Sequence, residues 1–171
     1  MEETLILIKP DGMEKKLIGE IISRLEKSGL EIVHSKILVP SEDMLEKHYT
    51  LTDEWVSSLA SKTRDAMAKK GVQMPETDLE IAKRVQSWLK QSLSAGKVMA
   101  MVWKGNQAVS IVRKLIGATE PKSAAGGTIR GDFSTDSYDL ADKEQRSVKN
   151  LIHASGTVDE AKREIQIWFG Y

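Results

Sequence analysis

The 171-residue sequence contains no cysteine, which excludes disulfides, thiolate nucleophiles and cysteine-ligated metals. Aromatic residues make up only 5% of the chain, which disfavours a platform that stacks single-stranded bases. The 25 basic and 25 acidic side chains cancel, so a protein that chiefly coats nucleic acid or anionic membrane is also disfavoured. No apolar run approaches the roughly 20 residues that span a bilayer, and no signal peptide is recognisable. We therefore expect a soluble protein of the cytoplasm.

The order of apolar patterns predicts one α+β domain over residues 1–171. Strands are expected at 4–9, 31–39, 98–103 and, very short, 151–152. Helices are expected from residue 17 to the glycine at 29, in two polar stretches within 52–96, and at 108–116, 139–148 and after Thr157. Residues 10–12 are expected to form a turn, and 118–133 a loop. This order predicts a ferredoxin-like βαββαβ fold, with a four-stranded antiparallel sheet covered by helices.

His153 is the first candidate for chemistry, because it follows a buried apolar run and precedes a helix that Thr157 caps with Glu160 in a capping box. The helix N-terminus beyond it favours a bound phosphate. Imidazole is nucleophilic when neutral, and its ordinary pKa near 6.5 leaves it mostly neutral at pH 7. Glu164, in the following helix, is a candidate to fix the tautomer of the ring. A histidine that only forms a hydrogen bond at the helix start explains this stretch equally well.

The other two histidines are weaker candidates. His34 lies on the polar face of a predicted strand, and His48 lies at the end of a short helix, where a cation suits the helix dipole. A structural role is favoured for both.

Four further residues form a possible anion clamp: Lys9, Arg113, Thr119 and Arg130. Arg130 lies in a glycine-rich stretch, and its planar guanidinium can bind two phosphate oxygens at once. Lys9 lies at the C-terminal end of the first predicted strand, where ligand-binding groups are common. Each of the four, taken alone, is equally well explained as a solvated surface residue. The Walker A loop and the glycine loop of protein kinases are both missing, which disfavours those two classes of phosphotransferase.

Several segments together resemble one family, the nucleoside diphosphate kinases. They are IKPDG, LIGEII, HY (His48-Tyr49), AMVWKG, the GAT-EP stretch after the helix of Arg113, GGTIRGDF, NLIHAS and EIQIWF, and they follow the order of the family over nearly the whole chain. The resemblance implies a ping-pong exchange in which a nucleoside triphosphate, chiefly ATP, phosphorylates a histidine that then phosphorylates a nucleoside diphosphate. By matching position, His153 is the nucleophile, Glu164 orients its ring, Ser155 supports the site and Tyr49 shapes the pocket.

The resemblance also implies the nucleotide contacts. Lys9 and Asn150 contact the sugar hydroxyl region, while Arg113, Thr119 and Arg130 hold the phosphates. Mg²⁺ is the implied cofactor, held mainly by the phosphates rather than by a firmly assigned residue. Few base contacts are expected, so purine and pyrimidine nucleotides should all be substrates.

The chain departs from the family pattern in several places. Gly156 stands where the family usually carries an acid, and Asp159 is the nearest acid downstream. The stretches 52–94 and 134–149 are interpreted as insertions. Trp55, near the start of the first insertion, is a candidate to stack on the base or to fill the core. A homo-oligomer, hexamer or tetramer, is expected from the resemblance, although the short segment after WF leaves the assembly open. No membrane or specific nucleic-acid partner is expected.

Two alternatives to an active kinase remain at this point. A catalytically weakened nucleotide-binding or scaffold protein of the same fold would explain Gly156 and the insertions. An RNA-binding ferredoxin-like module would need aromatic residues on the first and third strands, and only Trp103 is available there.

Overall fold

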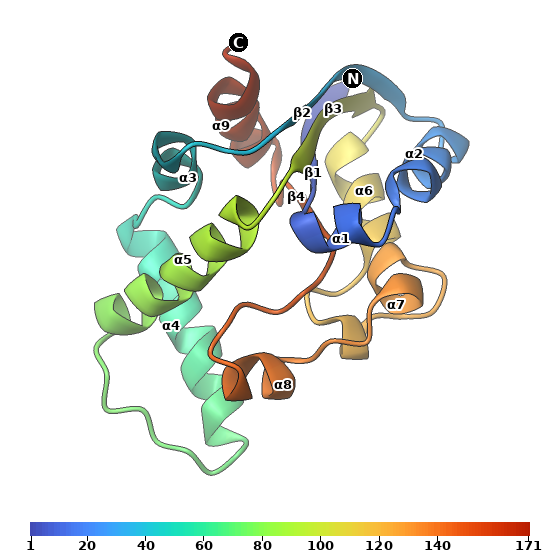
Figure 1. The fold of residues 1–171 in the computed structure, drawn as a ribbon. Helices are drawn as coiled ribbons and strands as arrows, with labels where there is room; N and C mark the ends of the chain where they lie inside the picture. The colour runs from blue at the N-terminus through green and yellow to red at the C-terminus, as the bar shows by residue number, and fades with distance from the viewer.

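A computed structural model describes residues 1–171 as one sheet with helices on both of its faces (Figure 1). In chain order the elements are β1 (Glu2–Ile8), α1 (Pro10–Glu14), α2 (Ile18–Lys27), β2 (Glu31–Leu38), α3 (Glu42–His48), α4 (Asp53–Ala68), α5 (Asp78–Ser94), β3 (Val98–Gly105), α6 (Ala108–Ile116), the short 3₁₀ helix η1 (Pro121–Ser123), α7 (Ile129–Phe133), α8 (Tyr138–Lys143), β4 (Ile152–Ala154) and α9 (Val158–Phe169). No helix is both long and apolar enough to cross a membrane.

The sheet has the order β2-β3-β1-β4, and every neighbouring pair is antiparallel, as the ferredoxin-like prediction requires. The central strand β1 is buried on both faces because alternate residues enter different cores. Ile6 and Ile8 join one apolar cluster, and Leu5 and Leu7 join the other. Leu7 is paired with His153 on β4, and residues directly opposite each other share a face. The register therefore turns His153 toward the face that carries Leu5 and Leu7.

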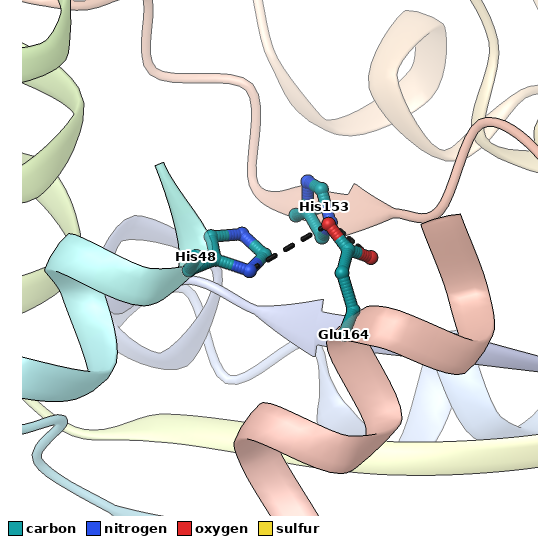
Figure 2. Close-up of side chains that lie close together, drawn as sticks. All are labelled: His48, His153 and Glu164. Carbon is teal, nitrogen blue, oxygen red and sulfur yellow. Dashed lines mark hydrogen bonds and ion pairs between the residues drawn. The ribbon is translucent and has the colours of Figure 1, made fainter. Parts of the chain in front are cut away.

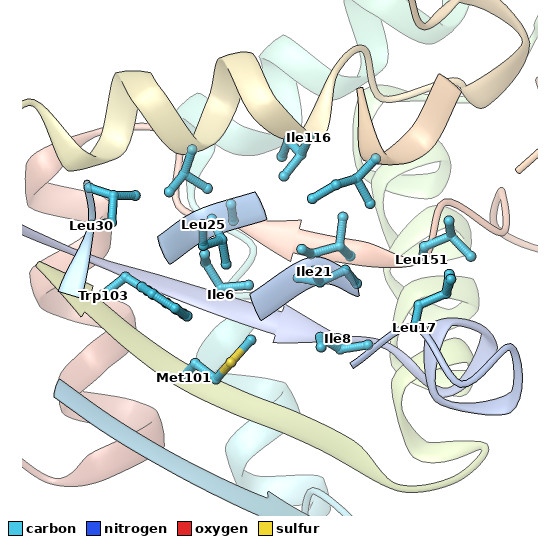
Figure 3. Packing of buried hydrophobic residues seen from close by; sticks show 14 of the residues in the cluster. Ile6, Ile8, Leu17, Ile21, Leu25, Leu30, Met101, Trp103, Ile116 and Leu151 are labelled. Atoms are coloured by element: carbon cyan, nitrogen blue, oxygen red, sulfur yellow. The ribbon is translucent and has the colours of Figure 1, made fainter. Parts of the chain in front are cut away.

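The two cores are built by different helices. The larger cluster receives apolar side chains from α2, α6 and α7, among them Ile21, Leu25 and Ile116 (Figure 3). The smaller cluster receives Leu45 from α3, Trp168 from α9 and Leu93 from α5. The face of His153 is thus the one covered by α3 and α9, and this positions the site described below.

Several local predictions differ from the structure. Residues 10–12, expected as a turn, open helix α1, since Pro10 occupies its first position, where the missing N–H costs nothing. The helix expected over 139–148 ends at Lys143. Arg146 instead turns back to form two hydrogen bonds with the buried Asp136, at 2.7 and 3.0 Å. The loop expected over 118–133 contains η1 and α7, each too short to show a periodic pattern.

The two segments that read as insertions meet in the fold. Helices α4 and α5 form a hairpin that extends away from the sheet, and α8 lies beside the end of α4 (Figure 1). Lys70 connects them through ion pairs to Asp139 at 2.6 Å and Asp142 at 3.4 Å. All three side chains are at least a third exposed, so these pairs orient the helices more than they stabilise them.

Candidate active site

His153 and Glu164 form the centre of the site (Figure 2). The Nε2 atom of His153 lies 3.0 and 3.1 Å from the two carboxylate oxygens of Glu164, and the Ser155 hydroxyl donates to Oε2 of Glu164 at 2.6 Å. The Glu164 side chain is only 1% exposed, whereas that of His153 is 22% exposed. The histidine is therefore reachable from solvent while the carboxylate that orients it is not.

The carboxylate determines which ring nitrogen of His153 is free. Burial by itself raises the pKa of Glu164, but His153, His48 and the Ser155 hydroxyl together lower that pKa to about 2. An ionised carboxylate can only accept, so Nε2 of His153 must donate its proton to it. In the neutral ring Nδ1 then keeps an unprotonated lone pair, which is the state that a nucleophile needs.

His48 belongs to the same cluster, although the sequence favoured a structural role for it. Its ring lies edge-on to that of His153, with centroids 4.7 Å apart, and its Nδ1 is 3.6 Å from Oε1 of Glu164. Tyr49 follows it and contacts the His48 ring edge-on, with centroids 4.6 Å apart. The sequence contained one signal that His48 belongs to the site: the His48-Tyr49 pair is among the segments that resemble the family. The resemblance, however, assigned a role only to Tyr49. The position of His48 opposite His153 arises from the packing of α3 against α9.

A second group joins Lys9, Asn150, Thr119 and Arg130. The Lys9 ammonium donates to Oδ1 of Asn150 at 2.8 Å, and the Asn150 amide donates to the carbonyl of Thr119 at 2.9 Å. Burial lowers the pKa of Lys9 to about 8, against the raising influence of Asp11. Four of the residues predicted to bind nucleotide are therefore connected, through a chain of hydrogen bonds, around the segment that leads into β4.

Arg130 forms the largest number of side-chain hydrogen bonds in this group. It is only 4% exposed, and its guanidinium donates to the carbonyls of Asn150, Gly117 and Ile152 at 3.2, 3.1 and 2.7 Å. Burial first, and then the nearby charge of Arg113, lower its pKa to about 10. Arg130 therefore stays charged, and three of its five N–H groups hold backbone close to His153.

We expect Arg130→Met to destabilise the protein by about 3–5 kcal/mol, because three carbonyls lose the guanidinium donor, two of them in buried hydrogen bonds. The melting temperature should fall by roughly 10 °C. Arg113→Met is the matched control: Arg113 is exposed, so its replacement should leave stability within about 0.5 kcal/mol while weakening nucleotide binding. Thermal unfolding and calorimetric titration with ADP distinguish the two variants. An Arg130→Met protein of unchanged stability would contradict the backbone-holding role.

Arg113 lines a surface cavity of about 530 Å³ together with Gly156, Thr157 and Val158. The carboxylate of Glu160 turns toward Gly156, where the sequence lacks the expected acid: its Oε2 accepts from the Gly156 N–H at 2.7 Å. A Cβ at position 156 would lie 2.8 Å from that oxygen, so the glycine makes room for it.

The two acids suggested by the sequence after the histidine behave differently. The side chain of Asp159 is 95% exposed and pairs with Lys162 at 3.5 Å, and it forms no hydrogen bond with Gly156, whose N–H bonds to Glu160. The predicted capping box is only half formed, since Thr157 accepts from the Glu160 N–H while the carboxylate of Glu160 bonds to Gly156 instead. The carboxylate of Glu160 thus belongs to the loop after β4.

Trp55 is placed apart from these groups. It is partly buried in the first turn of α4, where its backbone N–H donates to the Thr52 hydroxyl at 3.2 Å. No hydrogen bond joins it to the His153 cluster.

Comparisons with known proteins agree with this geometry. The family model described as "Nucleoside diphosphate kinase" matches residues 2–73 and 79–171. The chain belongs to the nucleoside diphosphate kinase family.

Individual members of the family are similar over most of their length. A protein of Pyrobaculum aerophilum named nucleoside diphosphate kinase is 44% identical over 99% of this chain and 95% of its own. One from Synechocystis is 38% identical over 99% of this chain and 88% of its own.

Solved structures of the family share the fold. A crystal structure of an NDP kinase from Pyrobaculum aerophilum has a TM-score of 0.93, with 44% identity over 98% of this chain and 95% of that one. A Borrelia burgdorferi nucleoside-diphosphate kinase, described as a transition state mimic with bound vanadate and ADP, has a TM-score of 0.79, with 36% identity over 98% of this chain and 86% of that one. The RNA-binding alternative is thereby set aside.

Proposed function

We propose that this chain is a nucleoside diphosphate kinase that transfers the γ-phosphate of an NTP to an NDP by a ping-pong mechanism through phospho-His153. The observation that carries the proposal is the contact between Nε2 of His153 and the buried Glu164 carboxylate, which leaves Nδ1 as the free nitrogen. The full-length similarity to proteins named nucleoside diphosphate kinase supports the same reaction.

In the proposed first half-reaction, the Nδ1 lone pair attacks the γ-phosphorus of the NTP. A P–N bond forms, the bond from the γ-phosphorus to the β,γ-bridging oxygen breaks, and the NDP leaves with that electron pair. The ring becomes cationic on phosphorylation, and the Glu164 carboxylate on Nε2 stabilises that charge. The second half-reaction reverses these bond changes with another NDP as acceptor, so the same groups serve both.

The nucleotide-binding roles are part of the same proposal. Arg113 faces the cavity beside Gly156, and Arg130 keeps two N–H groups beyond the three that bind carbonyls, so both can offer charge to the phosphates. Lys9 and Asn150 are proposed to contact the sugar hydroxyl region, Thr119 the phosphates, and Tyr49 the pocket near the histidine.

Mg²⁺ is the proposed cofactor. His48, His153 and Glu164 place ligand atoms within 4.8 Å of one another, but two imidazoles and one carboxylate suit transition metals better than Mg²⁺. The residues fit a Mg²⁺ held mainly by nucleotide phosphates and water, with Glu160 as the carboxylate nearest to Gly156. When bound, the ion neutralises charge on the phosphates.

Other features remain proposals. We propose a homo-oligomer, hexamer or tetramer: the edge strand β2 exposes Val33 and Ile37, and Val39 just after the strand is also exposed, so a neighbouring copy would cover these three apolar side chains. Trp55 stays the proposed base-stacking residue. We also propose that the chain is one domain with insertions at 52–94 and 134–149. The compartment that we propose for it is the cytoplasm.

The proposal is tested by incubating the protein with Mg²⁺ and γ-labelled ATP in the absence of an acceptor. We expect about one acid-labile, alkali-stable label for each chain, released when GDP or dCDP is added and missing when EDTA is present throughout. Nucleotide binding without any label would support the weakened scaffold protein instead and contradict the kinase.

A further inference from the structure

The His48 ring is buried, yet one of its nitrogens has no partner. Nδ1 lies 3.2 Å from the indole nitrogen of Trp168, and Nε2 has no hydrogen-bond partner. An indole N–H can only donate, so Nδ1 must accept from it and the proton of the neutral ring must be on Nε2. Burial, with the His153 ring adding to it, lowers the pKa of His48 to about 3, which keeps the ring neutral. The result is a buried N–H donor without an acceptor.

Such a donor is unusual in a folded protein, since a buried polar group without a partner destabilises the fold. The location of this donor, beside His153, indicates that it binds a ligand group. His48 lies edge-on to His153, at an angle of 78° between the ring planes, and in Figure 2 each ring directs one nitrogen toward Glu164 and the other away from it. The unpartnered N–H of His48 therefore lies beside the ring whose free Nδ1 would carry the phosphate.

Three hydrogen bonds, from helices α5 and α9, hold the segment that carries His48. Gln86 of α5 donates to the carbonyl of Tyr49 at 2.6 Å, and Arg163 of α9 donates to the carbonyl of Lys47 at 3.0 Å. Trp168 holds the ring itself. A donor fixed in place before the substrate binds needs no reorganisation when charge develops, which is the condition for effective electrostatic stabilisation.

We propose that His48 is a phosphate-binding residue whose Nε2–H donates a hydrogen bond to an oxygen of the phosphoryl group transferred to and from His153. The inference rests on the proposed function. In this role His48 exchanges no proton and forms no covalent bond. Its Nε2–H has no acceptor within the protein, and the phosphoryl oxygen would be that acceptor.

Two variants separate the hydrogen bond from the volume of the ring. His48→Phe keeps a ring but removes the donor, and phosphorylation of the protein by γ-labelled ATP should become about 10- to 100-fold slower. His48→Gln keeps an N–H of similar reach, and its rate should stay within about fivefold of the parent protein. The ³¹P resonance of the phosphohistidine should move in the Phe variant and much less in the Gln variant.

A third variant covers the case in which His48→Phe does not fold. Trp168→Phe leaves the histidine in place but removes the N–H that keeps Nδ1 an acceptor, so the proton can move to Nδ1. We expect ¹⁵N spectra to show a mixture of His48 tautomers and the phosphorylation rate to fall by about 3- to 10-fold.

The outcomes are distinguishable. A parent protein that takes up no label contradicts the proposed function and this inference with it. A parent protein that is labelled while His48→Phe reacts at the same rate contradicts the inference alone. Equal slowing in the Phe and Gln variants, with equal loss of thermal stability, would assign His48 to packing and overturn the hydrogen bond.

Discussion

Replacing His153 with asparagine is expected to lower turnover by roughly 10⁴-fold or more and to abolish labelling by γ-labelled ATP. The amide has no nucleophilic nitrogen, yet its N–H can still donate to the buried Glu164, so the pocket keeps a partner for its charge. The ring is 22% exposed, which favours retention of the fold after this change. Steady-state transfer from ATP to GDP and quantified label on the protein measure the two effects.

Two controls give this experiment its meaning. The melting temperature of His153→Asn should lie within a few degrees of the parent value, about 1–2 kcal/mol for a chain of this size. ADP should still bind, because the groups proposed to hold phosphate, Arg113 and Arg130, are untouched. Label that persists on the His153→Asn protein would show that another side chain accepts the phosphate, and would contradict the assignment of His153.

Glu164→Gln is expected to reduce turnover by roughly 10²- to 10⁴-fold while leaving a histidine in place. The Ser155 hydroxyl, which donates to Oε2 at 2.6 Å, should bind the carbonyl oxygen of the new amide and turn its NH₂ toward His153. An NH₂ group donates, so Nε2 becomes the acceptor and the proton moves to Nδ1, where it blocks the nucleophilic lone pair. The phosphorylated ring also loses its countercharge.

The ¹⁵N spectrum of the His153 ring provides the direct measurement, with the Nε2–H form expected in the parent protein and the Nδ1–H form in Glu164→Gln. Ser155→Ala is the matched control. It removes one hydrogen bond to the carboxylate but leaves its charge, so the tautomer should stay and turnover should fall by only about 10-fold. A Glu164→Gln protein with the parent tautomer and parent turnover would remove Glu164 from the mechanism.

Local sequence pattern predicted the long strands and helices but not the shortest helices. The strands at 4–9, 31–39 and 98–103 and the helix at 108–116 were predictable from local pattern. The first and third strands are continuous apolar runs, the second alternates and the helix has a helical period, and a proline or a glycine follows each closely. The shortest helices were not predictable, because α7 has only 5 residues and cannot show a period. The helix predicted over 139–148 was cut short by a tertiary contact, the pair of Arg146 with Asp136, which no local pattern reveals.

The site divides in the same way. The sequence by itself determined the candidate nucleophile, His153, and the acid that orients it, Glu164. The two residues lie within twelve residues of each other, one on a strand and the other on the helix that follows it. Only the tertiary structure brought His48 beside them, from 105 positions earlier in the chain, and only it showed that Glu160 rather than Asp159 turns toward Gly156. A local period fixes which way a side chain faces on its own element, but the partner it meets there depends on how distant elements pack.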